Sequence, residues 1–234
     1  MVEIVVPEDP VNVCRKLMPR GKRVRVIGST FAFTSDRDGL ANVPRMPADG
    51  TGEPERLAPS TEAQSMSSWS SGGVIAYLQG PAVQRDIWVL PPGGQPAPFL
   101  ASDANEMYAT FSPDGRWLAY SSDETGRAEV YVRPYPGPGA ATLISGDGGR
   151  SPAWLRDGRR IYFVQPRAGR DPVMMVVDVA PGDPFRAGRA AALIDPWPCQ
   201  RTGLARAFDV LADGSFAATL DEGVEVAGER SERV

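Results

Sequence analysis

Short apolar runs alternate with turn-forming polar segments along most of the chain, most clearly between Phe111 and Pro134. In the turn Ser-Pro-Asp-Gly that follows Phe111, Pro113 presets φ for the second position of a type I turn. Gly115 takes the left-handed position that closes a three-residue hairpin loop. The run Trp117 to Tyr120 comes next, rich in aromatic residues and too short for a helix. It predicts a strand buried on both faces.

Two more strands follow in the same segment. Val130 to Val132 lies after a second turn, and Thr142 to Ile144 lies after the turn Pro-Gly-Pro-Gly. The pattern predicts a four-stranded antiparallel meander of about 40 residues, which is the size of one β-propeller blade.

This unit recurs along the chain. Hairpin glycines stand four positions after an apolar residue at Gly73, Gly115, Gly158 and Gly214, at intervals of 42, 43 and 56 residues. The segment FAFTSDRDG also matches LAYSSDETG, which lies 87 residues further on. A period of 40 to 45 residues with four strands per unit is typical of a β-propeller.

The repeats predict an all-β chain with four recognisable blades and a partial fifth. We expect an N-terminal extension over 1–23, the propeller over 24–228 and a polar tail over 229–234. In the first blade, Val24 to Ile27 can turn through Gly28-Ser29 into the next strand. Pro44 falls in the third strand of this blade. Proline cannot donate to the ladder, so this blade should be the weakest or have an exposed edge.

The last interval is longer than the period because of an insertion between Pro181 and Ala205. Trp197 lies in this insertion among prolines. It could anchor the insertion on the blade or act as an exposed recognition residue, and packing is the commoner outcome for a lone tryptophan.

Several of these segments resemble the WD-like, Pro-Asp-containing repeats of TolB-type β-propellers: FTSDRDG, RMPADGTGEPERL, DIWVL, FSPDGRWLAYSSDETG, EVYVRPYPGPG and SPAWLRDGR. They look most like the C-terminal propeller domain found behind bacterial serine/threonine kinases. The resemblance runs from about Phe31 to Leu220. It implies a propeller, usually six-bladed in TolB, and binding rather than chemistry.

The chain departs from that family pattern in its repeats, which are too few for six blades and damaged in the first and last units. It also carries no kinase motif. We therefore expect an incomplete or open ring, whose unpaired terminal blades would favour self-association or a neighbouring domain.

The composition, charge and missing motifs of the chain argue against several classes of function. The 234 residues carry a net charge of −4, which argues against nucleic acid as a partner. Histidine is absent, which removes Ser-His-Asp and Cys-His catalysis and histidine-ligated zinc. Cys14 and Cys199 form no CxxC motif, and no phosphate-binding GxxxxGK[ST] loop occurs. We expect no enzymatic activity, no cofactor and no metal.

The chain start is acidic and interrupted by prolines, so it does not read as a signal peptide. No stretch reaches the roughly 18 apolar residues of a membrane span. These features predict a cytoplasmic protein by default, or a periplasmic one if the chain is a fragment of a longer exported protein.

Aspartates recur at the turns. Asp36 with Asp38, and Asp123 with Glu124, resemble fragments of a calcium loop, but hairpin turns are the favoured interpretation because more oxygens would be needed. Another set, Asp114, Asp157 and Asp213, occurs once per blade at one structural position. That repetition indicates architecture rather than a catalytic site.

Loops between the second and third strands, and between blades, share one face of a propeller. The charged residues that we expect on this candidate binding face are Asp36, Arg37, Arg85, Asp123, Glu124, Arg127, Arg167 and Arg170. The first strands line the axis, so Glu106, Tyr108, Ser151 and Arg206 are expected near the central channel.

Three function classes stay open. The chain could be a noncatalytic protein-binding or sensory propeller of TolB type, with a protein partner that the sequence does not identify. It could also be the propeller gate of a prolyl-oligopeptidase-like serine peptidase. The third class is a fragment of a multidomain protein, such as a kinase, without independent activity.

Overall fold

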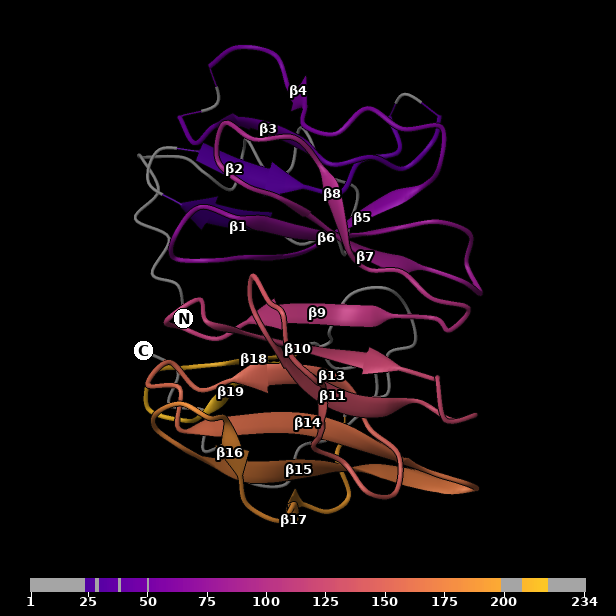
Figure 1. The fold of residues 1–234 in the computed structure, drawn as a ribbon, viewed down its shortest axis with the longest axis vertical. Helices are drawn as coiled ribbons and strands as arrows, with labels where there is room; N and C mark the ends of the chain where they lie inside the picture. The colour runs from indigo at the N-terminus through magenta and orange to yellow at the C-terminus, as the bar shows by residue number, and fades with distance from the viewer. Residues whose placement is uncertain (1–23, 28–29, 38, 50, 199–207, 219–234) are drawn as a thin grey trace, which may run out of the picture.

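The computed structural model describes residues 24–27, 30–37, 39–49, 51–198 and 208–218. Its regular elements are all β-strands, and no helix occurs among the described residues. The strands form antiparallel sheets, of which the first four follow one another from top to bottom in Figure 1. The expected all-β propeller with four blades and a partial fifth is confirmed.

The first three blades are four-stranded meanders whose strands pair in sequence order. Blade 1 contains β1 (Val24–Ile27), β2 (Thr30–Phe33), β3 (Pro44–Pro47) and β4 (Glu55–Arg56). Blade 2 contains β5 (Gln64–Trp69), β6 (Ile75–Gln79), β7 (Asp86–Leu90) and β8 (Ala97–Leu100). Blade 3 contains β9 (Met107–Phe111), β10 (Trp117–Ser122), β11 (Glu129–Pro134) and β12 (Thr142–Leu143).

Blade 4 has an additional strand, which the sequence did not predict. It contains β13 (Arg150–Trp154), β14 (Arg160–Arg167), β15 (Arg170–Ala180), β16 (Arg186–Ala187) and β17 (Ala191–Ile194). β16 pairs with the end of β15, and β17 pairs with its middle. Part of the insertion between Pro181 and Ala205 therefore forms β16 and β17, which pair with different parts of the long strand β15.

Blade 5 is represented by β18 (Phe208–Val210) and β19 (Phe216–Ala218), which pair with each other. Among the described strands, no ladder joins this sheet to blade 1, so those strands do not close the ring through a shared sheet.

The hairpin between the first two strands has the same construction in each blade from 2 to 5. In blade 3, the Gly115 amide donates to the Ser112 carbonyl at 2.9 Å, and Gly115 has φ 72°. Asp114 completes the turn because its Oδ1 accepts the Arg116 amide at 3.1 Å. The same carboxylate contact recurs at Asp157 and Asp213. These aspartates are turn caps, as their repetition predicted.

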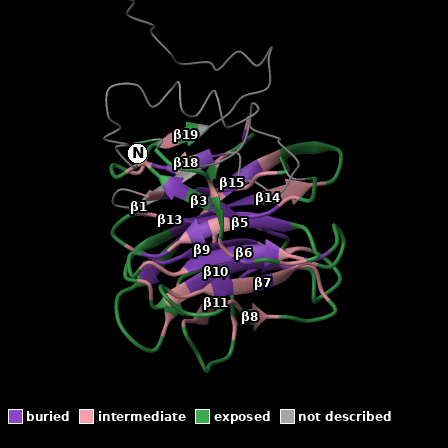
Figure 2. Cartoon of the chain, turned by 90° about the horizontal axis from the view of Figure 1, so that it is seen from above, coloured by how far each residue is buried: buried purple, intermediate pink, exposed green. Residues whose placement is uncertain are grey.

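Hydrophobic contacts between neighbouring blades form the core. On β10, Leu118 and Tyr120 pack in the cluster shared with blade 2, whereas Ala119 packs in the cluster shared with blade 4. The strand is therefore buried on both faces, as its apolar run predicted. Figure 2 shows this purple core of strands with green, exposed loops around it.

Trp197 packs within the fold. Its side chain is 3% exposed and contacts Phe208 and Phe216 with ring centroids 5.6 and 5.5 Å apart. Its backbone amide donates to the Pro172 carbonyl at 2.8 Å. Of the two interpretations of this residue, the structure supports the anchor: it ties the insertion of blade 4 to blade 5.

Blade 1 follows the predicted strand order. β1 pairs with β2 as expected, whereas Pro44 is the first residue of β3 and does not lie inside the strand. The outer strand β4 has only two residues, both exposed. The outer strand β12 of blade 3 is equally short and exposed, so the length of β4 does not set blade 1 apart.

Candidate binding face

The predicted site residues lie on four blades. Asp36 and Arg37 follow β2, Arg85 precedes β7, and Asp123, Glu124 and Arg127 lie between β10 and β11. Arg167 and Arg170 belong to strand ends rather than to a loop, because β14 and β15 run further than predicted and pair at these two residues. The tight turn between them uses Gly169, which has φ 65°.

Arg127 is held by three acceptors. Its Nε donates to Glu129 Oε1 at 2.6 Å, its Nη1 to Asp147 Oδ1 at 2.9 Å, and its Nη2 to the Gly146 carbonyl at 2.9 Å. The side chain is nevertheless about half exposed. The hydrogen bond to Glu129, with the nearby charge of Asp147, raises the pKa of Arg127.

Glu129 organises the loop between blades 3 and 4. It is buried and accepts hydrogen bonds from the Ser145 hydroxyl and from the Gly148 amide. The Ser145 hydroxyl in turn accepts the Val130 amide at 2.7 Å. One buried carboxylate thus fixes both the start of β11 and the inter-blade loop.

The loop between blades 2 and 3 has a comparable cross-link. Asp123 Oδ1 accepts the Asn105 amide at 2.8 Å, and Asn105 Oδ1 accepts the Arg85 amide at 3.1 Å. The Arg85 Nη1 donates to the Ala82 carbonyl at 2.5 Å. Burial lowers the pKa of Arg85. Two of the predicted residues, Arg85 and Asp123, are therefore linked through Asn105.

Glu106 does not line an open channel, because it is only 1% exposed. Its Oε1 accepts the Ser102 hydroxyl at 2.6 Å, and its Oε2 is buried without a partner among the described residues. Burial raises the pKa of Glu106 to about 7; the Ser102 hydrogen bond opposes this, and the charges of Asp86 and Asp123 add to it.

Tyr108 and Ser151 are also buried, and they occupy equivalent places in blades 3 and 4. Both have a left-handed backbone, with φ 56° and 58°, where the register of the first strand shifts. Burial raises the pKa of Tyr108, while Arg150, Ser151 and Arg85 oppose that shift. Arg206, the fourth residue expected near the channel, lies outside the described residues.

The calcium-loop fragments form backbone turns. The Gly39 amide donates to the Asp36 carbonyl at 3.0 Å, and the Gly126 amide donates to the Asp123 carbonyl at 2.8 Å. Asp38 lies outside the described residues. No group of three or more acidic or cysteine side chains that could hold a metal ion occurs in the part of the chain that the structure describes.

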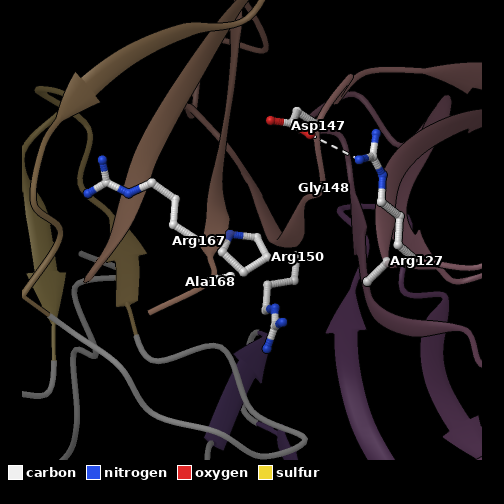
Figure 3. A pocket seen from close by; sticks show the side chains of 8 residues that line it. Arg127, Asp147, Gly148, Arg150, Arg167 and Ala168 are labelled. Atoms are coloured by element: carbon white, nitrogen blue, oxygen red, sulfur yellow. Dashed lines mark hydrogen bonds and ion pairs between the residues drawn. The ribbon is translucent and has the colours of Figure 1, made fainter. Parts of the chain in front are cut away.

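A pocket of about 410 Å³ opens between blades 3 and 4 on the candidate face (Figure 3). Its lining residues are Arg127, Ala128, Asp147, Gly148, Arg150, Pro166, Arg167 and Ala168. The structure thus brings two predicted residues, Arg127 and Arg167, to one pocket, and the other six do not line it. The Arg167 guanidinium binds both carboxylate oxygens of Asp195, at 3.1 and 2.6 Å.

Sequence reasoning missed Arg150 and Asp147. Arg150 stands at the start of the innermost strand of blade 4, directly after the inter-blade loop. The alignment of the repeats could have placed Arg150 at the mouth of the channel. Its position relative to Arg127 and Arg167 could not be predicted in this way, because it depends on how blades 3 and 4 pack.

No protein-family model matches the chain, and no curated protein matches it either. Solved structures do resemble it. A putative TolB from Agrobacterium tumefaciens is 20% identical with a TM-score of 0.58, over 64% of this chain and 58% of that one. TolB from Acinetobacter baumannii is 17% identical with a TM-score of 0.50, over 64% and 38%. The matched region thus spans less than two thirds of either TolB chain.

Propellers of other proteins are similar as well. A gluconolactonase from Xanthomonas campestris is 15% identical with a TM-score of 0.58, over 82% of this chain and 66% of that one. A puromycin-hydrolyzing peptidase from Mycobacterium tuberculosis is 16% identical with a TM-score of 0.55, over 80% and 33%. At these identities the likeness concerns the fold, which is that of a TolB-like β-propeller.

Proposed function

We propose that this chain is a noncatalytic protein-binding module. Its binding face is formed by the loops between blades and by the loop between the second and third strands of each blade. The observation that carries the proposal is that this face is polar and internally braced. Arg127, Asp123 and Arg167 are each held by hydrogen bonds to a neighbouring loop or strand. Preordered side chains lose less conformational entropy when a partner binds.

The absence of enzymatic activity is part of the proposal. The sequence contains no histidine, and its recurring aspartates serve as turn caps. The described residues also contain no helix long and apolar enough to cross a membrane. A cytoplasmic location stays a prediction, with the periplasm as the alternative for a longer exported chain.

A second candidate function is the propeller part of a multidomain protein, such as a kinase or a prolyl-oligopeptidase-like serine peptidase. The similarity to a peptidase supports it, because the matched region covers only 33% of that enzyme. In this case the chain would have no independent activity, and its partner would be the adjoining domain.

The test is a pull-down from the native organism with the intact chain and a charge-balanced face variant, Glu124→Lys with Arg170→Glu. Both residues are exposed. The matched control, Glu53→Lys with Arg159→Glu, swaps two exposed charges at turns of the opposite face. We expect a partner that binds the wild type and the control and is lost from the face variant.

Equal capture by all three proteins would contradict the use of this face. Peptidase, esterase and kinase assays complete the test. Turnover that survives repurification and disappears when one residue of this chain is mutated would overturn the noncatalytic assignment.

A further inference from the structure

The pocket between blades 3 and 4 differs in charge from the whole molecule. Its lining carries three arginines and one aspartate, whereas the chain has a net charge of −4. Figure 3 shows Arg127, Arg150 and Arg167 around the pocket, with their guanidinium groups pointing in different directions. The remaining lining residues are small or apolar, so they leave the space open and offer few competing acceptors.

Two of the three arginines already have carboxylate partners. Arg127 is paired with Glu129 and Asp147, and Arg167 is paired with Asp195. Arg150 has no hydrogen bond or ion pair with any residue that the structure describes, and its Nε is buried without an acceptor. A buried donor without an acceptor is destabilising, so this guanidinium favours an added acceptor.

The backbone of Arg150 is fixed in place. The preceding Gly149 donates its amide to the Ala128 carbonyl at 2.8 Å. A Cβ at Gly149 would lie 2.8 Å from the Ser145 Cβ, so the loop requires glycine for this close approach. Arg150 itself pairs with Val164 of β14. The start of its side chain is therefore positioned before any ligand arrives.

We propose that Arg150 binds a carboxylate of an acidic segment of the protein partner in this pocket, with Arg127 as a second cation at the rim. The proposal rests on the proposed function, since it specifies the chemistry of the partner. A guanidinium offers five N–H donors in a planar fork that matches the two oxygens of a carboxylate. A phosphate presents similar oxygens, so free inorganic anions form the second arm of the test.

The experiment measures fluorescence anisotropy of a labelled oligoglutamate peptide with the full chain, with oligoglutamine as the neutral probe. The variants are Arg150→Gln, Arg150→Lys and the control Arg159→Gln, which removes an exposed charge on the opposite face. Arg150→Gln should weaken oligoglutamate binding about tenfold or more, because it removes charge-assisted hydrogen bonds. Arg150→Lys should recover part of the affinity, and Arg159→Gln should bind like the wild type.

Thermal melts check that each variant is folded. If Arg150→Gln does not fold, the comparison of Arg150→Lys with the wild type still tests the proposal. Equal binding by the wild type and both Arg150 variants, or no binding of oligoglutamate, overturns the proposal. Binding of inorganic phosphate at Arg150 without binding of the peptide also overturns it, in favour of a small-anion site. If the pull-down partner binds Arg150→Gln as tightly as the wild type, the protein-binding function stands and this site assignment fails.

Discussion

The Nε of Arg127 donates a 2.6 Å hydrogen bond to Oε1 of Glu129, joining a half-exposed cation to a carboxylate that is almost fully buried. The same carboxylate accepts the Ser145 hydroxyl and the Gly148 amide. Glu129 is thus one of the residues that fasten the loop between blades 3 and 4 to blade 3, together with Arg127 and the backbone of Ala128. The arrangement also sets the position of the pocket wall at Gly148.

Glu129→Ala should therefore destabilise the protein by about 2 to 3 kcal/mol. The substitution leaves the buried Gly148 amide without its acceptor, and it removes the acceptor of the Ser145 hydroxyl. Urea denaturation followed by tryptophan fluorescence measures the change. Glu53→Ala, at an exposed position, is the matched control and should stay within about 0.5 kcal/mol of the wild type. Equal midpoints for both variants would show that Glu129 does not fasten the loop.

Glu106 gives a pH-dependent prediction. Burial raises its pKa from 4.5 to about 7 in the folded protein. The unfolded chain releases this proton at a lower pH than the folded one does. The stability contribution of the protonated carboxyl is therefore fully present below about pH 4.5 and is lost as the pH rises to about 7. At roughly 1.4 kcal/mol per pH unit, the total loss is up to about 3 kcal/mol.

Glu106→Gln should flatten this part of the pH profile, because an amide of the same shape does not ionise. The test measures the urea midpoint of unfolding for the wild type and the variant at several pH values between 4.5 and 8. We expect the two curves to diverge as the pH rises, with the variant the more stable at pH 8. Parallel curves would mean that the carboxyl keeps its ordinary pKa; Glu53→Gln serves as the exposed control.

Trp197 provides a prediction about the insertion of blade 4. Trp197→Ala should destabilise the protein by about 3 to 5 kcal/mol, because it removes an aromatic side chain packed against Phe208 and Phe216. Trp197→Phe should cost less than Trp197→Ala, since it keeps an aromatic ring and the indole Nε1 has no partner among the described residues. Thermal melts distinguish the two variants. An alanine variant that melts like the wild type would contradict the role of Trp197 as an anchor of the insertion.

How far the sequence predicts this molecule depends on the range of the interactions involved. The turn at Gly115 was predictable because φ at this glycine and the cap by Asp114 depend on neighbouring residues alone. The extension of β14 to Arg167 was not predictable. The residues at this strand end are polar, and they belong to the strand because they pair with β15. Repetition of such local units then identified the propeller.

The candidate site was less predictable for the same reason. Strand order predicts which loops share a face, and two of the residues predicted there, Arg127 and Arg167, line one pocket. Arg150 joins them only through the packing of blade 4 on blade 3, which no local pattern encodes. Even the hydrogen bond from Trp154 Nε1 to the Thr110 carbonyl, at 3.2 Å, links residues that are one repeat apart.

The last prediction concerns the edge of blade 5. Among the described strands, β19 has β18 as its only neighbour, and Ala217 on β19 is exposed. An unpaired strand edge is a template for pairing with a second chain. We therefore expect the isolated chain to self-associate as its concentration rises, as measured by size-exclusion chromatography with light scattering.

Ala217→Lys should shift the population toward monomer, because a charged lysine on an edge strand opposes edge-to-edge pairing. Ala212→Lys adds the same charge in the neighbouring turn and should leave the association unchanged. A wild-type chain that stays monomeric at every concentration, with a sharp melt at high temperature, would show that the terminal edge is already satisfied.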